Sequence, residues 1–234
     1  VWAVRFSPDS KYMATASGDG TSKVLDLVSR EIVATVEHED SVWDVKFSPD
    51  SNYMATISDD GTTKVLDLAS REIVATIEHV DHVRTVVFSP DSKYMATASE
   101  DGTSKVLDLA GREIVATVEH EKYVWDVTFS PDSKYMATAS DDGTSRILDL
   151  ASREIVATVE HEDYVWAVRF SPDSKYMATA SGQTATVWPF RQEDLILEAC
   201  SRLSRNLSQE EWDRYLPGVP YRQTCPCEEC RHKV

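Results

Sequence analysis

Five near-identical segments follow one another along the chain at a fixed spacing. The first begins at Val1 with VWAVRFSPDS, and related stretches begin at Val42, Val83, Val124 and Val165, a period of 41 residues each time. Self-similarity at such a period means that one supersecondary unit is repeated and that each unit depends on its neighbours for burial. The repeat therefore constrains the fold of most of the chain more than any local feature does.

Each unit has the pattern of four short strands separated by tight turns. In the second unit, apolar and variable residues alternate, Ser-Pro-Asp-Ser and Asp-Gly mark turns, and no helical period is present. The expected strands are Val42–Phe47, Tyr53–Ser58, Thr63–Leu68 and Glu72–Glu78. Each unit is thus predicted to form a four-stranded antiparallel meander.

Such a sheet is apolar on both faces, and a single unit cannot bury them alone. Successive units must therefore stack face to face around an axis, which predicts an all-β propeller. We expect the propeller to cover residues 1–190 and a short helical tail to cover residues 191–234. Five blades are visible, and the repeat is lost after the third strand of the fifth. The blades are therefore expected to belong to a larger ring.

The repeats resemble those of WD-repeat proteins, which carry a Gly-His pair near the start and a Trp-Asp pair at the third strand. Here Glu-His replaces the first pair and Leu-Asp replaces the second. The resemblance implies a buried hydrogen-bond chain of His, Ser or Thr and the tight-turn Asp, which fixes the geometry of the blade. The matching residues are His38, His79, His120, His161, Asp19, Asp60, Asp101 and Asp142.

Charge and cysteine content narrow the classes of partner and compartment. The net charge is −16, and residues 1–190 carry 17 Lys and Arg against 32 Asp and Glu, a net −15. An acidic surface repels phosphate backbones, so nucleic acid is not expected as a partner. No apolar run reaches the length of a membrane span, and all four cysteines lie after residue 190. We therefore expect a cytoplasmic protein with no membrane partner.

Comparison of the five copies separates constant from variable positions. The Ser-Pro-Asp-Ser turn is identical in all five units, and the turn after the third strand is nearly constant. The meander places both of these turns at one end of the blade, called here the bottom face, and places the variable positions at the other end, called the top face. The variable positions are Trp2, Trp43, Arg84, Trp125, Trp166, Asp44, Asp126, Asp59, Glu100, Asp141, His82, Tyr123 and Tyr164.

Diversification confined to one face indicates a recognition surface on a constant scaffold. The alternative is drift at positions where packing is indifferent. Trp and Tyr supply most interface hot spots, and acidic neighbours suit a protein or peptide partner that carries basic and apolar groups. The interpretation favoured here is a partner-binding top face that needs no cofactor.

Two other groups of residues could carry chemistry. Each complete unit contains His, a hydroxyl residue and Asp, which could form a nucleophilic triad, but a catalytic site would not be copied into every blade. The other group is in the tail, where Cys225, Cys227, Cys230 and His232 could bind zinc. Structural zinc sites usually take ligand pairs from separate segments, and these four candidates lie in one terminal peptide, so no metal is expected.

The tail carries a second resemblance. Residues 192–203 have a helical period, and Ser208 to Glu211 is a capping box for another helix. Residues 194–226 resemble the closing segment of bacterial WD-repeat signalling proteins, whose propellers follow an upstream effector domain such as a STAND-type NTPase. This resemblance implies a missing N-terminal effector domain and a sensor role.

Three hypotheses follow for the function. The first is a non-catalytic binding module of a signalling protein that captures a protein or peptide on its top face. The second is an oligomer in which near-identical blades pair between chains. The third is an enzyme on a propeller scaffold, for which the only odd unit, the fifth, offers Gln183, Thr184 and Pro189, residues poorly suited to catalysis.

Overall fold

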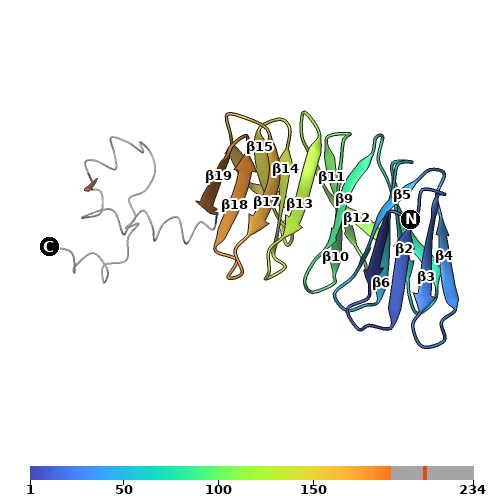
Figure 1. The fold of residues 1–234 in the computed structure, drawn as a ribbon. Coiled ribbons are helices and arrows are strands. Elements are labelled where there is room, and N and C mark those ends of the chain that lie inside the picture. Colours follow the sequence, from blue (N-terminus) through green and yellow to red (C-terminus); the bar gives the residue numbers. More distant parts are fainter. Residues whose placement is uncertain (191–207, 210–234) are drawn as a thin grey trace. The chain divides into compact units, whose positions relative to one another are not determined.

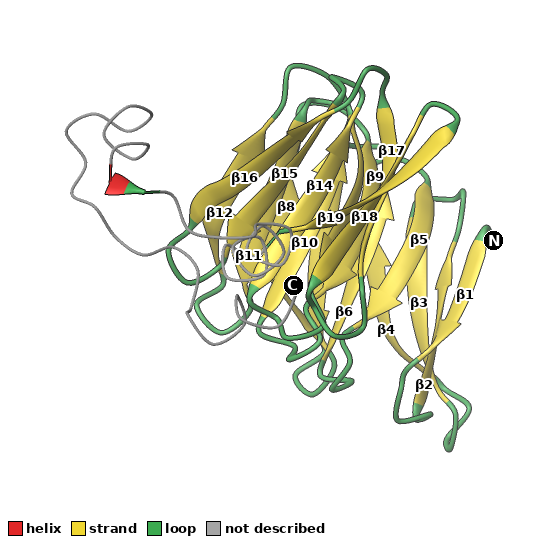
Figure 2. Cartoon of the chain, turned by 90° about the vertical axis from the view of Figure 1, so that its left-hand side faces the viewer, coloured by secondary structure: helices red, strands yellow, loops and turns green. Residues whose placement is uncertain are grey.

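A computed structural model describes residues 1–190 and 208–209. The first predicted tail helix, the second one after its first two residues and the four zinc candidates lie outside them. The chain divides into a unit of residues 1–187 and a unit of residues 188–234. Residues 1–190 consist of strands joined by turns, as Figure 2 shows. In this part of the chain the all-β prediction is confirmed.

In residues 1–190, nineteen strands form five separate antiparallel sheets, which are the blades. Blades 1 to 4 have four strands in sequential order, and the fifth has three strands within the described residues. Figure 1 shows the blades following one another in chain order from the blue β2 to the brown β19. The strands are β1 (Ala3–Phe6), β2 (Tyr12–Ala16), β3 (Thr21–Asp26), β4 (Ile32–Glu37), β5 (Val42–Phe47), β6 (Tyr53–Ser58), β7 (Thr62–Asp67), β8 (Glu72–Glu78), β9 (Val83–Phe88), β10 (Tyr94–Ser99), β11 (Thr103–Asp108), β12 (Glu113–Glu119), β13 (Val124–Phe129), β14 (Tyr135–Ser140), β15 (Thr144–Asp149), β16 (Glu154–Glu160), β17 (Val165–Phe170), β18 (Tyr176–Ser181) and β19 (Thr184–Pro189).

The core lies between blades. One face of blade 1 packs on blade 2 through a cluster that joins Ala16, Val24 and Val36 to Val45 and Met54, and equivalent clusters join the next pairs. Every one of these five side chains is fully buried. Because burial of apolar area is the main favourable term in folding, neighbouring blades stabilise one another.

A polar contact on the bottom face repeats at each of these junctions. The hydroxyl of Ser51 in the second Ser-Pro-Asp-Ser turn accepts a hydrogen bond of 3.1 Å from the backbone N–H of Asp9 in the preceding blade. The same bond joins Asp50 to Ser92, Asp91 to Ser133 and Asp132 to Ser174. The constant turn is therefore part of the contact between blades, which gives a physical reason for its invariance.

Three turns in each of blades 1 to 4 need unusual backbone angles. Ser51 and Arg71 have φ of 60° and 63°, the left-handed region. Gly61 has φ of 78°, and a Cβ there would lie 2.8 Å from the carbonyl oxygen of His79. Glycine is required at this turn both by its conformation and by the close approach of the next link.

Within the described residues, the first and the last blade each expose apolar side chains that the other blades bury. In blade 1 the side chains of Val4 and Phe6 are 45% and 63% exposed, whereas the equivalent Val45 is fully buried by blade 1. At the other end Val187 of β19 is 62% exposed, whereas the equivalent Val24 is fully buried. Blade 1 thus presents the same apolar face that blades 2 to 5 bury against a neighbour.

This contrast predicts unequal costs for the same substitution. Phe129→Ala removes a buried ring from the junction of blades 3 and 4 and should lower the free energy of unfolding by about 3–5 kcal/mol. Phe6→Ala removes a ring that is already mostly in water, and its cost should stay below about 1 kcal/mol. Denaturant unfolding measures both. Equal losses would mean that the face of blade 1 is covered in solution.

Candidate functional site

The top face is formed by the turns between the second and third strands and by the links between blades. In blade 2 these are Ser58 to Gly61 and the link from His79 to His82, and the other blades repeat them. The variable Trp or Arg of each unit lies where the link enters the first strand. Sequence positions 41 residues apart are therefore brought to one face.

The variable residue after the leading Val is a bulged residue in blades 2 to 5. In blade 2, Val42 is paired with Ser58 and Asp44 with Ile57, so that Trp43 is the extra residue between them. The same shift places Arg84, Trp125 and Trp166 outside the ladder. A β-bulge bends the strand and changes the direction of a side chain, and bulges recur next to functional sites.

Aromatic side chains on this face pair between blades. The rings of Trp2 and Trp43 are stacked with centroids 5.2 Å apart. The guanidinium of Arg84 lies over the ring of Trp125, 5.0 Å from its centroid, and Tyr123 meets the same ring edge-on. Blade 3 therefore places a cation on the next blade's Trp, where blade 1 places an aromatic ring.

The variable acids have different partners inside the protein. Glu100 forms an ion pair with Arg84 of its own blade, and Asp141 accepts a 3.4 Å hydrogen bond from the indole N–H of Trp125. Asp59 instead lies 3.4 Å from Nδ1 of His82, in the link to the next blade. Blade 2 is thus the one of these three blades whose turn acid pairs with the link to the next blade and not with its own bulged residue.

Asp44 and Asp126 differ from the other predicted contact residues. Asp44 forms an ion pair with Arg5 at 3.1 Å, and Asp126 pairs with Arg169 and accepts the N–H of Val168 at 3.1 Å. These bonds cross from one blade to the next. Asp44 and Asp126 thus join the first strands of adjacent blades. These ion pairs within the protein explain why the two positions differ between units without a contact to a partner.

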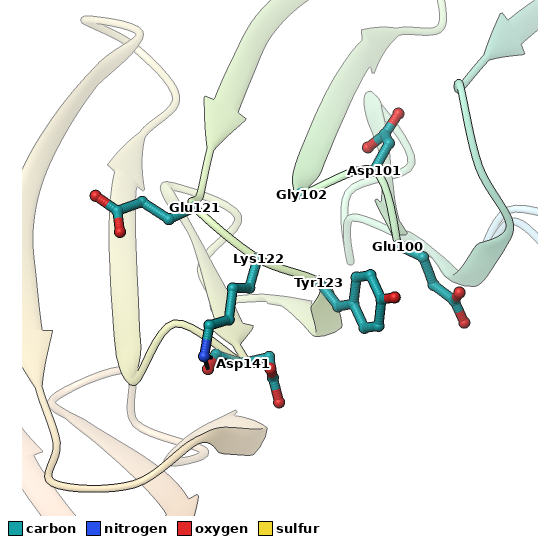
Figure 3. A pocket seen from close by; sticks show the side chains of 7 residues that line it. All are labelled: Glu100, Asp101, Gly102, Glu121, Lys122, Tyr123 and Asp141. Atoms are coloured by element: carbon teal, nitrogen blue, oxygen red, sulfur yellow. Dashed lines mark hydrogen bonds and ion pairs between the residues drawn. The ribbon is translucent and has the colours of Figure 1, made fainter.

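Two cavities open on the top face, and Glu100 lines both. The blade 2/3 cavity has a volume of about 450 Å³ and is lined by Trp43, Asp59, His82, Val83, Arg84 and Glu100. The blade 3/4 cavity has a volume of about 360 Å³ and is lined by Glu100, Asp101, Gly102, Glu121, Lys122, Tyr123 and Asp141. In Figure 3 the Lys122 side chain reaches to Asp141, and Tyr123 points to the Glu100 side. Tyr164, from the following link, is also exposed.

Sequence comparison missed two variable positions on this face. Lys122 stands where three other units have Asp, and Val80 stands where the others have Glu. Lys122 lines the blade 3/4 cavity, and Val80 is almost fully exposed. The same unit-by-unit comparison that identified the bulged residues would have found both.

Beneath the top face, a His–Thr–Asp network joins the link to the next blade. Nδ1 of His79 lies 2.9 Å from Asp101, and its Nε2 lies 2.8 Å from the hydroxyl of Thr97. His38 has the same contacts with Asp60 and Thr56, and His120 with Asp142 and Thr138. A carboxylate only accepts hydrogen bonds, so a neutral imidazole carries its proton on Nδ1 and accepts the threonine O–H at Nε2.

Burial sets the protonation of this network. Desolvation lowers the pKa of His79 below 6.5, partly opposed by the charge of Asp101. Burial alone would raise the pKa of Asp101, but hydrogen bonds from Thr103 and from the N–H of Val80 outweigh it and bring the pKa to about 2. The folded protein therefore holds a neutral imidazole against an ionised carboxylate.

The network has the atom order of a nucleophilic triad, but its hydroxyl groups are inaccessible. Thr56, Thr97 and Thr138 are fully buried, and so are the imidazoles of His38, His79 and His120. A substrate carbonyl cannot reach these oxygens. The network acts as a structural link between blades.

Blades 1 and 5 carry only part of the network. Asp19 of blade 1 bonds to the N–H and hydroxyl of Thr21 within its own turn. In blade 5 the turn between the second and third strands is one residue shorter. It contains only Gly182 and Gln183, whereas the turn of each other blade has two acidic or small residues followed by glycine. His161 therefore faces a blade without the tight-turn Asp, and burial lowers its pKa.

Within residues 1–190 and 208–209, no group of three or more His, Cys, Asp or Glu side chains is placed to hold a metal ion. In the same residues, no helix has the length and apolar character needed to cross a bilayer.

The blade sheets, their shared apolar junctions and the repeated buried network define a β-propeller repeat protein. The family model for "WD domain, G-beta repeat" matches residues 1–26, 30–67, 71–108, 112–149 and 153–189. This match covers well over half of the chain, which belongs to the WD40 family. WD40 repeats indicate a protein–protein interaction scaffold, and such propellers are generally non-catalytic. No curated protein matches the chain.

The buried network predicts loss of stability in acid. The unfolded chain takes up protons near pH 6.5 at histidines whose folded pKa is lower, so stability falls as the pH drops below 6.5. Below pH 3.8 the Asp residues with pKa of about 2 add to the loss.

His79→Gln should flatten this dependence between pH 7 and pH 5, because one of the titrating imidazoles is gone. We compare the denaturant midpoints of the unmodified protein and the variant at each pH. The difference separates the contribution of His79 from the loss of negative charge that both proteins share. Parallel pH curves for the two proteins would contradict the assignment.

Proposed function

We propose that the chain is a non-catalytic binding module whose top face takes up a protein or peptide segment with basic groups. The observation that carries the proposal is the bulge in blades 2 to 5, which places the variable Trp or Arg outside the sheet ladder. Trp43, Trp166 and Tyr164 leave about half of their surface in water although they are large and apolar. Rigid aromatic side chains of this kind are typical binding hot spots.

Electrostatics support the chemistry of the partner. Residues 1–190 have a net charge of −15, with 17 basic and 32 acidic side chains. The variable acids Asp59, Glu100 and Asp141 line the two top-face cavities. An acidic field of this kind attracts a basic segment and accelerates its association at low salt. We do not include Asp44 and Asp126 among the direct contacts, because neighbouring blades occupy their carboxylates.

We further propose a sensor role within a bacterial signalling protein, on the resemblance of residues 194–226 to the closing segment of such proteins. In this scheme the top face captures the partner, and an upstream effector domain in the cytoplasm responds. Of residues 194–226 the structure describes only 208 and 209.

The binding proposal predicts that peptide capture depends on the top-face aromatic residues. Peptides selected from a random library on the immobilised protein should bind the Trp43→Ala, Trp125→Ala, Trp166→Ala variant at least about tenfold more weakly, since each hot spot contributes more than about 1 kcal/mol. Affinity is measured by calorimetry, and circular dichroism checks that the variant is folded.

Ile73, Ile114 and Ile155 provide a matched control at the opposite end of the blades. They are exposed to about the same extent as Trp43 and Trp166, Ile73 being 47% and Trp43 46% exposed. Replacing these three by Ala should leave the affinity unchanged. Selected peptides that bind both variants equally well would show that the top face is not the docking surface.

A second candidate function is assembly between copies, favoured by the bare faces at Phe6 and Val187. Exposed apolar patches at the ends of a repeat array promote heterologous association. Under this alternative, light scattering will give a mass that rises with concentration, and Phe6→Asp will return it to that of one chain. A constant single-chain mass would exclude the alternative.

A further inference from the structure

We infer that the blade 2/3 cavity binds one arginine side chain of the partner segment, with its guanidinium stacked on Trp43 and paired with Asp59. This inference rests on the proposed function and specifies the group that one part of the top face recognises. It draws on a contact that the protein itself makes between blades 3 and 4 with the same two kinds of chemical group.

That internal contact is the arrangement of Arg84, Glu100 and Trp125. The Arg84 guanidinium lies over the Trp125 ring, 5.0 Å from its centroid, and forms an ion pair with Glu100. An indole face and a carboxylate together satisfy a guanidinium, which stacks through its plane and donates from its edge. On the top face the protein therefore already binds one of its own arginine side chains with an indole ring and a carboxylate.

The blade 2/3 cavity offers the same two groups, both from blade 2, and its own Arg84 contacts Glu100 and Trp125 instead of them. Trp43 lines it, stacks on Trp2 by its ring, and is still 46% exposed. Asp59 lines it too, and its partner there is the imidazole of His82 at 3.4 Å, which is charged only when protonated. The cavity volume of about 450 Å³ is ample for one long side chain.

The charge balance of the cavity favours one added cation. Its other charged groups, Arg84 and Glu100, form an ion pair with each other. Apart from the imidazole of His82, the carboxylate of Asp59 is the remaining charged group, in a site with an aromatic wall. A single guanidinium neutralises it, while a second carboxylate would be repelled. Arginine suits the site better than lysine because only its planar group matches the indole face.

The test uses the full chain labelled with 5-fluorotryptophan and a short probe peptide, acetyl-Gly-Gly-Arg-Gly-Gly amide. Trp43→Phe identifies the fluorine resonance of Trp43 among the six tryptophans. The arginine peptide should shift this resonance saturably, and the otherwise identical citrulline peptide, which is uncharged, should not. The lysine peptide should bind about fivefold or more weakly than the arginine peptide.

Two variants and two controls test the contacts. Trp43→Ala and Asp59→Asn should each weaken binding of the arginine peptide about tenfold. Ile73→Ala and Glu154→Gln alter an exposed apolar side chain and an exposed carboxylate at the bottom face, and both should bind as the unmodified protein does. Thermal melting verifies that the variants fold.

Several results would overturn the inference. These are equal binding of the citrulline peptide, unchanged affinity in Asp59→Asn, or a shift confined to tryptophans other than Trp43. If library-selected peptides require the top-face tryptophans but neither arginine nor Asp59, the inference fails and the proposed function stands. If no selected peptide depends on those tryptophans, the proposed function itself fails.

Discussion

Burial of apolar surface between neighbouring blades is the constraint on which the remaining structure depends. A single sheet carries apolar residues on both faces, as Val45 and Met54 on one side and Val65 on the other illustrate, and all three are fully buried between blades. The backbone bond from Asp50 to the hydroxyl of Ser92 adds a directional contact at the bottom of the same junction. Because one turn serves both its own blade and the next, a change in it disturbs two sheets at once.

The top face can vary because its bulged residues take no part in the pairing of the sheet strands. A bulged residue is outside the ladder, so replacing Trp by Arg at position 84 costs no sheet hydrogen bond. The replacement is matched locally, since Glu100 stands where blades 2 and 4 have Asp and reaches the guanidinium. Variation between blades therefore has two sources, internal pairing and exposure to a partner, and unit-by-unit comparison alone cannot separate them.

The sequence was sufficient for the strands and their order. In the second unit three of the four expected strands have the predicted bounds, and the third, expected at Thr63–Leu68, begins one residue earlier at Thr62. Period and turn residues encode such local features directly. Contacts between blades, such as that of Asp44 with Arg5 or of Arg84 with Trp125, cannot be predicted in this way. They depend on the angle and distance between sheets, which no local pattern specifies.

The family repeat and the sheet are offset by one strand. Residues 30–67 form one family repeat, which joins the outer strand β4 of blade 1 to the inner strands β5, β6 and β7 of blade 2. Gain or loss of one 41-residue unit through unequal recombination would thus leave every sheet with its full number of strands. The number of blades would change by one. The order of the bulged side chains on the top face would change with it, while the fold of each blade stayed the same.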